Sequence, residues 1–257
     1  MIGTNNLNNK LNEFNSCGFV VIKNLINIKK IKDYEKEIDK ISKILVTNYS
    51  SPYVNLTKDK KMNTGHHLNE LFPKSNLMKI KNNYLLKKFL KKIFNKPLIM
   101  KNLEIFAKPP KTGLKAPFHQ DNFYWNIKKK MAVNVWIALD KVTIKNGGLI
   151  YIKGSHKLGL LKHRRSNIPG SSKEIIPHFL KKIKAKRISP KLFPGDCLIH
   201  HCEVVHGSNQ NKTSQRRRGI AIRFVARNSQ IDKQNMKKYL NAMLFKFFLR
   251  IFLCTVI

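Results

Sequence analysis

Acidic residues are scarce in this sequence, with 14 Asp and Glu against 51 Lys and Arg and a formal net charge of +37. A surface of one sign attracts nucleic acids, anionic membranes and anionic small molecules. The excess is mainly lysine and is spread over most of the chain, together with many Asn and Ile, which indicates a bias of the whole composition. We therefore do not expect nucleic acid to be the partner, and the charge favours an anionic substrate only slightly.

Cysteine is also scarce, and its spacing is uninformative. The four residues, Cys17, Cys197, Cys202 and Cys254, match neither a zinc knuckle nor the disulfide framework of a small secreted domain. The segment Met1–Asn9 is polar and lacks the apolar centre of a signal peptide. We expect reduced thiols and a cytoplasmic protein.

Long apolar runs are missing as well. No segment reaches the ~20 apolar residues that span a bilayer. The nearest approach, Leu244–Ile257, is interrupted by Lys246 and Arg250. Packing of this segment on its own domain or on a partner is the stronger interpretation, and peripheral membrane contact through an interfacial helix is the alternative. The sequence does not indicate an oligomeric state.

The N-terminal part has helical periodicity. At 257 residues and 42% hydrophobic content, the chain can form one large domain around a substantial core. We expect residues 1–97 to be mainly helical support, with residues 46–76 polar and irregular. The expected helices are 6–16, Ile28–Leu45 and Leu77–Phe94, and the expected strand is Phe19–Ile22.

After residue 97, short β-type runs recur between Gly and Pro turns, which is typical of a barrel or jelly roll. We expect a β core over residues 98–227, a C-terminal extension over 228–257, and a single α+β domain over 1–257. Residues 158–190 fit this pattern poorly and read as a long insertion at the sheet rim, a candidate lid. The expected strands are Leu98–Lys108, Met131–Leu139, Leu149–Ile152, Cys197–His201 and Gly219–Val225.

The pattern His119-Gln120-Asp121 is the first candidate for chemistry. Residues two apart on a strand share a face, so the imidazole and the carboxylate would project together. Alone the pattern is weak, because a surface His beside a capping Asp looks the same. His206, which follows the turn Pro194-Gly195-Asp196, would add a second imidazole. Two His and one carboxylate form a facial set that leaves three positions of Fe(II) open. A single His is equally explained as a structural residue.

Arg217, eleven residues after His206, is the candidate for holding a dicarboxylate co-substrate. Arginine binds carboxylates through two parallel hydrogen bonds. Arg216 and Arg218 flank it and would lie on the opposite face of a strand. Spacing alone does not decide which face is the functional one.

From about residue 98 to 227, the chain resembles the phytanoyl-CoA dioxygenase family. The order and spacing of several motifs follow that family, and Phe14–Leu25 is weakly similar to its opening strand. The matching stretches are His119-Gln120-Asp121-Asn122-Phe123-Tyr124-Trp125, Val135-Trp136-Ile137-Ala138-Leu139-Asp140, Asn146-Gly147-Gly148-Leu149-Ile150, Gly154-Ser155-His156, Pro194-Gly195-Asp196-Cys197, and His206-Gly207-Ser208 continuing through Asn211 to Arg217-Arg218.

The resemblance implies a double-stranded β-helix, a cupin-like jelly roll, with the N-terminal helices packed on one face. It implies Fe(II), with 2-oxoglutarate and O₂ as co-substrates and ascorbate as a supporting reductant. His119, Asp121 and His206 match the metal ligands. Arg217 matches the 2-oxoglutarate arginine, Ser208 a hydroxyl that supports the same carboxylate, and Trp136 a residue lining that pocket; a core role for Trp136 is equally plausible.

The resemblance also implies a reaction. Related halogenases replace the carboxylate ligand with a small residue, so the presence of Asp121 indicates hydroxylation of an aliphatic C–H bond in a small organic substrate, for which the positive charge slightly favours an anion. The alternatives are a β-helix protein that binds a ligand without turnover, a basic protein that binds nucleic acid or membrane surfaces, and an oxygenase acting on a macromolecule.

Substrate contacts are expected from two stretches, residues 50–75 with His66 and His67, and the insertion 158–190. His200 and His201 alternate on a strand, so one of them should face the cavity, although a structural role is the stronger interpretation of each. Three further residues match the family: Gln120 and Asn122, expected to have structural roles, and Lys108, with no assigned role.

Overall fold

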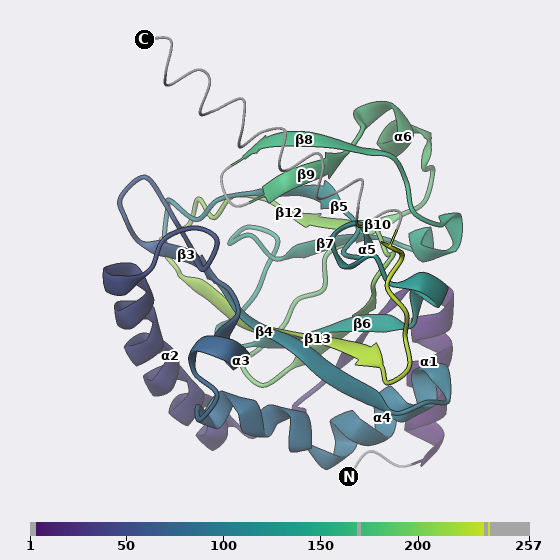
Figure 1. Cartoon of the computed structure of the whole chain (residues 1–257), viewed down its shortest axis with the longest axis horizontal. Helices are drawn as coiled ribbons and strands as arrows, with labels where there is room; N and C mark the ends of the chain where they lie inside the picture. The colour runs from purple at the N-terminus through teal and green to yellow at the C-terminus, as the bar shows by residue number, and fades with distance from the viewer. Residues whose placement is uncertain (1–3, 169–170, 234–235, 237–257) are drawn as a thin grey trace.

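The computed structural model of the chain describes residues 4–168, 171–233 and 236 (Figure 1). Its N-terminal part confirms the first two expected helices and the strand between them: α1 (Thr4–Cys17), β1 (Phe19–Ile22) and α2 (Ile28–Asn48). Asn27 begins α2 by accepting a hydrogen bond from the Lys29 backbone N–H. The residues that α2 buries follow the predicted spacing of three and four: Ile31, Tyr34, Ile38, Ile41 and Leu45.

The single helix expected over Leu77–Phe94 is wrong. The segment is divided into a 3₁₀ helix, η1 (Asn76–Asn82), and α4 (Tyr84–Phe94). Asn83 separates them, because its side chain accepts a hydrogen bond from the Leu86 backbone N–H and so caps α4. Asn competes with the helix for backbone hydrogen bonds in this way, and the apolar periodicity of the segment conceals the break.

Residues 46–76 are more ordered than expected. They contain β2 (Val54–Leu56), β3 (Met62–Gly65) and the short helix α3 (Leu68–Leu71). The two strands form a hairpin that continues the large sheet beyond β4. Strands of three and four residues are too short to show alternation, so only pairing with a neighbour defines them.

Two sheets face each other at the centre of the molecule (Figure 1). The larger has the order β1-β11-β6-β13-β4-β3-β2, and the smaller β10-β7-β12-β5. This is a double-stranded β-helix of antiparallel strands, as expected. The remaining strands of the two sheets are β4 (Leu98–Lys108), β5 (Ala116–His119), β6 (Ala132–Ala138), β7 (Leu149–Ile152), β10 (Arg187–Ile188), β11 (Cys197–His201), β12 (His206–Ser208) and β13 (Arg217–Ala226).

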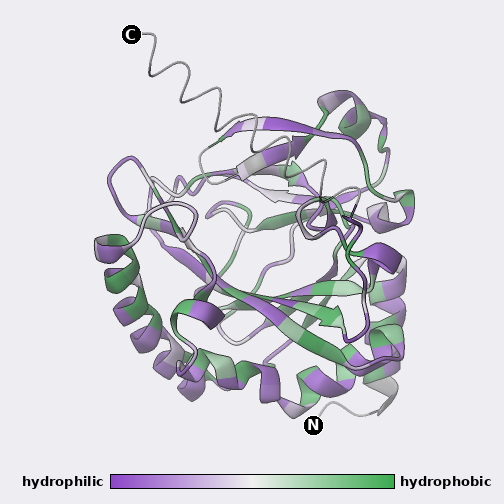
Figure 2. Cartoon of the chain, viewed as in Figure 1, coloured by the Kyte–Doolittle hydropathy of each residue, from purple (hydrophilic) through white to green (hydrophobic). Residues whose placement is uncertain are grey.

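The outer face of the large sheet packs on α1, α2 and α4, which cover one side of the molecule (Figure 1). Alternation on β6 places Val133, Val135 and Ile137 in this core, whereas Trp136 and Ala138 face the smaller sheet. The strands of the large sheet are correspondingly rich in hydrophobic residues (Figure 2). The inner face is therefore left for the site.

The insertion 158–190 is not an irregular loop. It contains a hairpin of β8 (His163–Ile168) and β9 (Ser171–Ile175), the helix α6 (Pro177–Lys182), and β10, which pairs with β7. The hairpin lies over the smaller sheet and is largely hydrophilic (Figures 1 and 2). Its alternation is weak in the sequence because most of its side chains are polar. Its role as a lid stays a prediction.

Two expectations concern the chain's relation to membranes and to redox chemistry. None of the helices in the described ranges is long and apolar enough to cross a bilayer, and Leu244–Ile257 lies outside those ranges. Cys17, Cys197 and Cys202 are free thiols, and Cys254 is likewise outside the described residues.

His201 belongs to the outer core and not to the cavity. Its ring lies 6.4 Å from that of Phe14 and 6.2 Å from that of Phe94, measured between centroids. Burial, followed by the charges of His156 and Lys130, lowers the pKa of His201 to about 3. The unfolded chain binds this proton near pH 6.5, so the stability that neutral His201 contributes is present above pH 6.5 and is lost as the pH falls towards 3.

Acidification should therefore destabilise the fold through His201. Between pH 7.5 and 5, we expect this residue to lower the free energy of unfolding by about 1–2 kcal/mol. In the wild type, His201 Nδ1 accepts a hydrogen bond from the Glu203 backbone N–H. The variant His201→Asn keeps an acceptor for this N–H, but its side chain does not titrate. Urea unfolding at both pH values should show that acidification lowers the free energy of unfolding less in the variant than in the wild type. An equal decrease in both proteins would contradict this role of His201.

Candidate functional site

Two imidazoles meet because their strands pair. His119 ends β5 and His206 begins β12, and the two residues are direct partners in the antiparallel register. Their ring centroids are 4.3 Å apart. Nδ1 of His119 donates to the Pro117 carbonyl at 2.8 Å, and Nδ1 of His206 donates to the Val204 carbonyl at 3.0 Å. With Nδ1 protonated in both rings, each Nε2 keeps a free lone pair for a metal.

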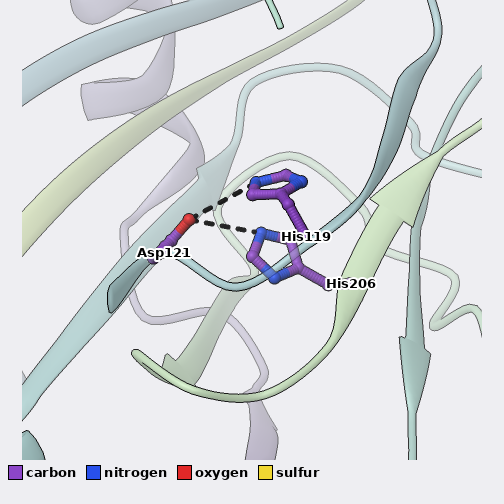
Figure 3. A group of neighbouring side chains, drawn as sticks. All are labelled: His119, Asp121 and His206. Atoms are coloured by element: carbon purple, nitrogen blue, oxygen red, sulfur yellow. Dashed lines mark ion pairs between the residues drawn. The ribbon is translucent and has the colours of Figure 1, made fainter. Parts of the chain in front are cut away.

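Asp121 completes the group, but not by strand alternation. It lies beyond the end of β5, in right-handed helical conformation, directly before the short helix α5 (Asn122–Trp125). This turn brings Oδ1 to 3.5 Å from Nε2 of both His119 and His206 (Figure 3). The three ligand atoms lie within 4.8 Å of one another, which fits a single metal ion. The three predicted residues do converge, but strand alternation, the physical reason given for their convergence, was wrong, and their role as metal ligands stays a prediction.

The protonation states suit a metal. Burial opposes the charge of Asp121, but His206, His119 and His200 hold the pKa of its carboxyl well below its usual range. Burial and the neighbouring His119 lower the pKa of His206 to about 3. Asp121 is therefore ionised and His206 neutral at neutral pH, whereas the hydrogen bond to Asp121 outweighs burial and raises the pKa of His119. Two nitrogens and one oxygen, with no thiolate, are a donor set suited to Fe(II).

The second carboxylate oxygen of Asp121 is held from the large sheet. Oδ2 accepts hydrogen bonds from His200 Nε2 at 3.0 Å and from Asn134 Nδ2 at 3.1 Å. His200 Nδ1 in turn accepts from the Tyr151 hydroxyl at 2.8 Å. His200 thus faces the site, as predicted for one of the two histidines, and both of its ring nitrogens are hydrogen-bonded, as a structural role requires. Alternation in the sequence indicated that either His200 or His201 would do so, but not which.

Loss of this support should weaken metal binding. We expect His200→Phe to raise the Fe(II) dissociation constant by about 10- to 100-fold, the usual effect of removing a residue that orients a metal ligand. His200→Gln, which retains an N–H donor, should recover part of the affinity. An anaerobic Fe(II) titration measures both, with His201→Asn as the control on the opposite face. Equal affinity in His200→Phe and wild type would contradict the role.

Arg217 begins β13 and is buried, with 2% of its surface exposed. Its Nη2 donates to the Gly147 carbonyl at 2.9 Å, whereas Nε and Nη1 are buried without a hydrogen-bond partner in the described part of the chain. Its guanidinium lies 5.4 Å from the Trp136 ring centroid. Arg216 and Arg218 point the other way, towards Asp140 and Glu35. The fold thus places the Arg217 side chain, and not that of Arg216 or Arg218, on the inner face of the large sheet.

A second buried cation lies beside Arg217. Lys108 Nζ donates to Ser208 Oγ at 2.6 Å and to the Asn209 carbonyl. Burial, followed by the charge of Arg217, holds the pKa of Lys108 well below its usual range, and burial lowers that of Arg217 to about 10. The two unpaired nitrogens of Arg217, beside the Lys108 amine, are suited to an anionic partner. The carboxylate of 2-oxoglutarate fits this requirement, and Lys108 is the residue whose role the sequence left unassigned.

The other sequence candidates have definite places. Gln120 and Asn122 are buried and bond the backbone of Gly159, Glu203 and Ile127, which confirms their structural role. His66 bonds Glu104, while His67 is more exposed and lies 3.5 Å from Glu70. In the insertion, His163 stacks on Phe123 with ring centroids 4.2 Å apart.

Known proteins with related sequences share a description. "Phytanoyl-CoA dioxygenase, peroxisomal" of Homo sapiens is 26% identical over 256 residues, covering 90% of this chain and 73% of the human one. The mouse protein of the same description is 27% identical, over 80% of this chain and 64% of its own length. The "Phytanoyl-CoA dioxygenase domain-containing protein 1 homolog" of Caenorhabditis elegans is 25% identical, covering 87% of this chain and 92% of its own length.

Solved structures share the fold. The epimerase SnoN, in complex with Fe³⁺, α-ketoglutarate and nogalamycin RO, superposes with a TM-score of 0.72 at 18% identity, covering 89% of this chain and 87% of SnoN. EctD from S. alaskensis with 2-oxoglutarate and 5-hydroxyectoine gives 0.70 at 17% identity, covering 87% of this chain and 77% of EctD.

A family model supplies the assignment. The model described as "Phytanoyl-CoA dioxygenase (PhyH)" matches residues 14–219, which is most of the chain and includes all three members of the metal-binding group. The chain belongs to the phytanoyl-CoA dioxygenase family, whose members are Fe(II)- and 2-oxoglutarate-dependent oxygenases.

Proposed function

We propose that His119, Asp121 and His206 bind Fe(II), and that the protein hydroxylates an aliphatic C–H bond of a small organic substrate. The converging ligand atoms support the first part, because two imidazoles and one carboxylate within 4.8 Å of one another would hold one ion and use only three of its positions. The carboxylate at Asp121 supports hydroxylation over halogenation, because related halogenases have a small residue in its place. A cytoplasmic location stays a prediction, and the mammalian relatives are peroxisomal by name.

The observation that carries the proposal is the unused pair of donors on Arg217. A buried guanidinium with two nitrogens unpaired is costly unless a ligand pairs with them. We assign the far carboxylate of 2-oxoglutarate to Arg217, with Lys108 and Ser208 beside it and Trp136 as the wall of the pocket. A flat fork of N–H groups against a carboxylate also fixes the direction in which the co-substrate lies.

Bound Fe(II) and 2-oxoglutarate supply the oxidation, in which O₂ gives one oxygen atom to succinate, with release of CO₂, and the other to the C–H bond of the substrate. The chain's own residues bind and orient. His200 and Asn134 hold Asp121, and Arg217 holds the co-substrate. Tyr151, buried and stacked on the His206 ring with centroids 5.6 Å apart, keeps water from that side.

Succinate formation tests the proposal without a known substrate, because many such oxygenases turn over slowly when uncoupled. Purified protein with Fe(II), ascorbate, 2-oxoglutarate and O₂ should form succinate. Omission of Fe(II) or O₂ should stop it. Absence of succinate together with absence of Fe(II) binding would refute the metal site and favour a binding protein. Binding of polyanions without any of this chemistry would favour a basic surface protein.

A further inference from the structure

Three polar residues form a row across the inner face of the large sheet. Arg223 on β13 is the register partner of Asn102 on β4 and of Asn134 on β6. Arg223 is six residues after Arg217 on the same strand, so both side chains face the smaller sheet. We call Asn102, Arg223 and Asn134 the Asn–Arg–Asn row.

Each member of the row has an unsatisfied atom. Asn102 Oδ1, Arg223 Nε and Asn134 Oδ1 are buried and lack a hydrogen-bond partner among the described residues. Unpaired buried polar atoms are rare in folded proteins, and three in adjacent register positions require an explanation. The row offers one charged donor between two acceptors, which is the complement of a group that has both a carboxylate and an N–H or O–H.

The row begins at the metal centre. Asn134 donates to Asp121 Oδ2 at 3.1 Å through its Nδ2, which leaves its Oδ1 free. The Arg223 guanidinium lies 5.4 Å from the ring of Trp125, in the helix that follows Asp121. A ligand on the row would therefore lie next to the iron ligands.

Arg223 forms no direct ion pair among the described residues, although the charges of Glu104, Asp121 and Glu70 act on it from farther away. No carboxylate of the described residues lies within ion-pair distance of it, and the nearby Glu104 instead binds His66 at 2.8 Å. Asn102 donates to the same carboxylate at 3.1 Å. The three side chains are partly exposed although their unpaired atoms are buried, so a ligand would approach the row through the exposed part of each side chain.

The wall beyond the row is polar as well. Asn55 bonds Thr64 at 3.0 Å and His66 at 3.1 Å, and His66 continues the network to Glu104. A hydrocarbon chain packed against this wall would exclude water from its polar atoms and offer them no hydrogen bonds in exchange. Burial of polar atoms in this way is unfavourable. The wall thus disfavours a fatty acyl chain at the iron.

We infer that the Asn–Arg–Asn row binds the polar end of the substrate, with a carboxylate on Arg223 and an N–H or O–H on Asn102 or Asn134. The substrate is then a compact hydroxy acid or amino acid, not a long acyl thioester. This inference rests on the proposed function, because it places the target C–H bond beside the iron.

Glycolate is a suitable probe, because it has one carboxylate and one hydroxyl, and glycolamide is its uncharged analogue. The protein is loaded with Fe(II) and saturating 2-oxoglutarate without O₂, and binding is followed by the shift of the iron–2-oxoglutarate charge-transfer absorption. Glycolate should shift the band with saturation, and glycolamide should not at equal concentration. Arg223→Gln should raise the glycolate dissociation constant about tenfold or more.

Two controls separate the outcomes. Arg227→Gln removes the same charge at an exposed residue four positions along, and should leave the glycolate constant unchanged. Arg223→Lys, which keeps the charge but not the planar fork, should give an intermediate constant. Equal binding of glycolate to wild type and Arg223→Gln, no response to glycolate, or equal responses to glycolate and glycolamide would overturn the inference. Absence of the charge-transfer band in wild type would instead refute the proposed function.

Discussion

Asp121→Ala is expected to reduce succinate formation from 2-oxoglutarate by at least about 100-fold. The substitution removes the only oxygen ligand of the trio and leaves two neutral imidazoles, which bind Fe(II) weakly. It also leaves His200 Nε2 and Asn134 Nδ2 without their acceptor. Succinate measured with Fe(II), ascorbate and O₂, together with the Fe(II) dissociation constant, checks both effects.

The matched control is Asp196→Asn. Asp196 is also a buried carboxylate, and it pairs with Lys23 at 2.8 Å. It directly precedes β11, so it lies at the opposite end of that strand from His200, which bonds Asp121. This variant should lose stability and keep the Fe(II) affinity of the wild type. Retention of more than about a tenth of wild-type turnover by Asp121→Ala would show that the metal is held elsewhere.

Arg217→Gln is expected to raise the KM for 2-oxoglutarate by about 100-fold, equivalent to about 2.7 kcal/mol. Arg217 is buried and offers two unpaired nitrogens, whereas glutamine offers a single uncharged amide group. The affinity for Fe(II) should change little, because Arg217 is not among the metal-binding group. Initial rates of succinate formation against 2-oxoglutarate concentration provide the measurement.

Arg216→Gln is the neighbouring control. Arg216 has the same charge, but its side chain is 53% exposed and lies 3.4 Å from Glu35 and Asp140. Its loss should leave the KM for 2-oxoglutarate unchanged. If Arg216→Gln and Arg217→Gln raised KM equally, the general positive charge of the chain would explain co-substrate binding, and the pocket at Arg217 would not.

Local sequence patterns predicted most of the fold. Apolar spacing in α2 and alternation in β6 are local properties, and both are borne out. Local patterns failed where a short polar signal interrupts an apolar one, as at Asn83, and where strands are too short to alternate, as in β2 and β3. In each case a hydrogen bond accepted by a capping side chain, or pairing with a neighbouring strand, decides the structure.

By itself, the sequence determined the α+β class through its helix and strand patterns, and a resemblance covering about half of the chain pointed to His119, Asp121 and His206 as the candidate metal ligands. Tertiary structure decided what alternation leaves open: that His200 faces Asp121 and His201 does not, and that Arg217 is buried with two unpaired nitrogens whereas Arg218 pairs with Asp140 and Glu35. It also assembled the Asn–Arg–Asn row from three strands. The physical reason is that alternation gives two opposite faces without saying which is inside, and only pairing between distant strands fixes the register.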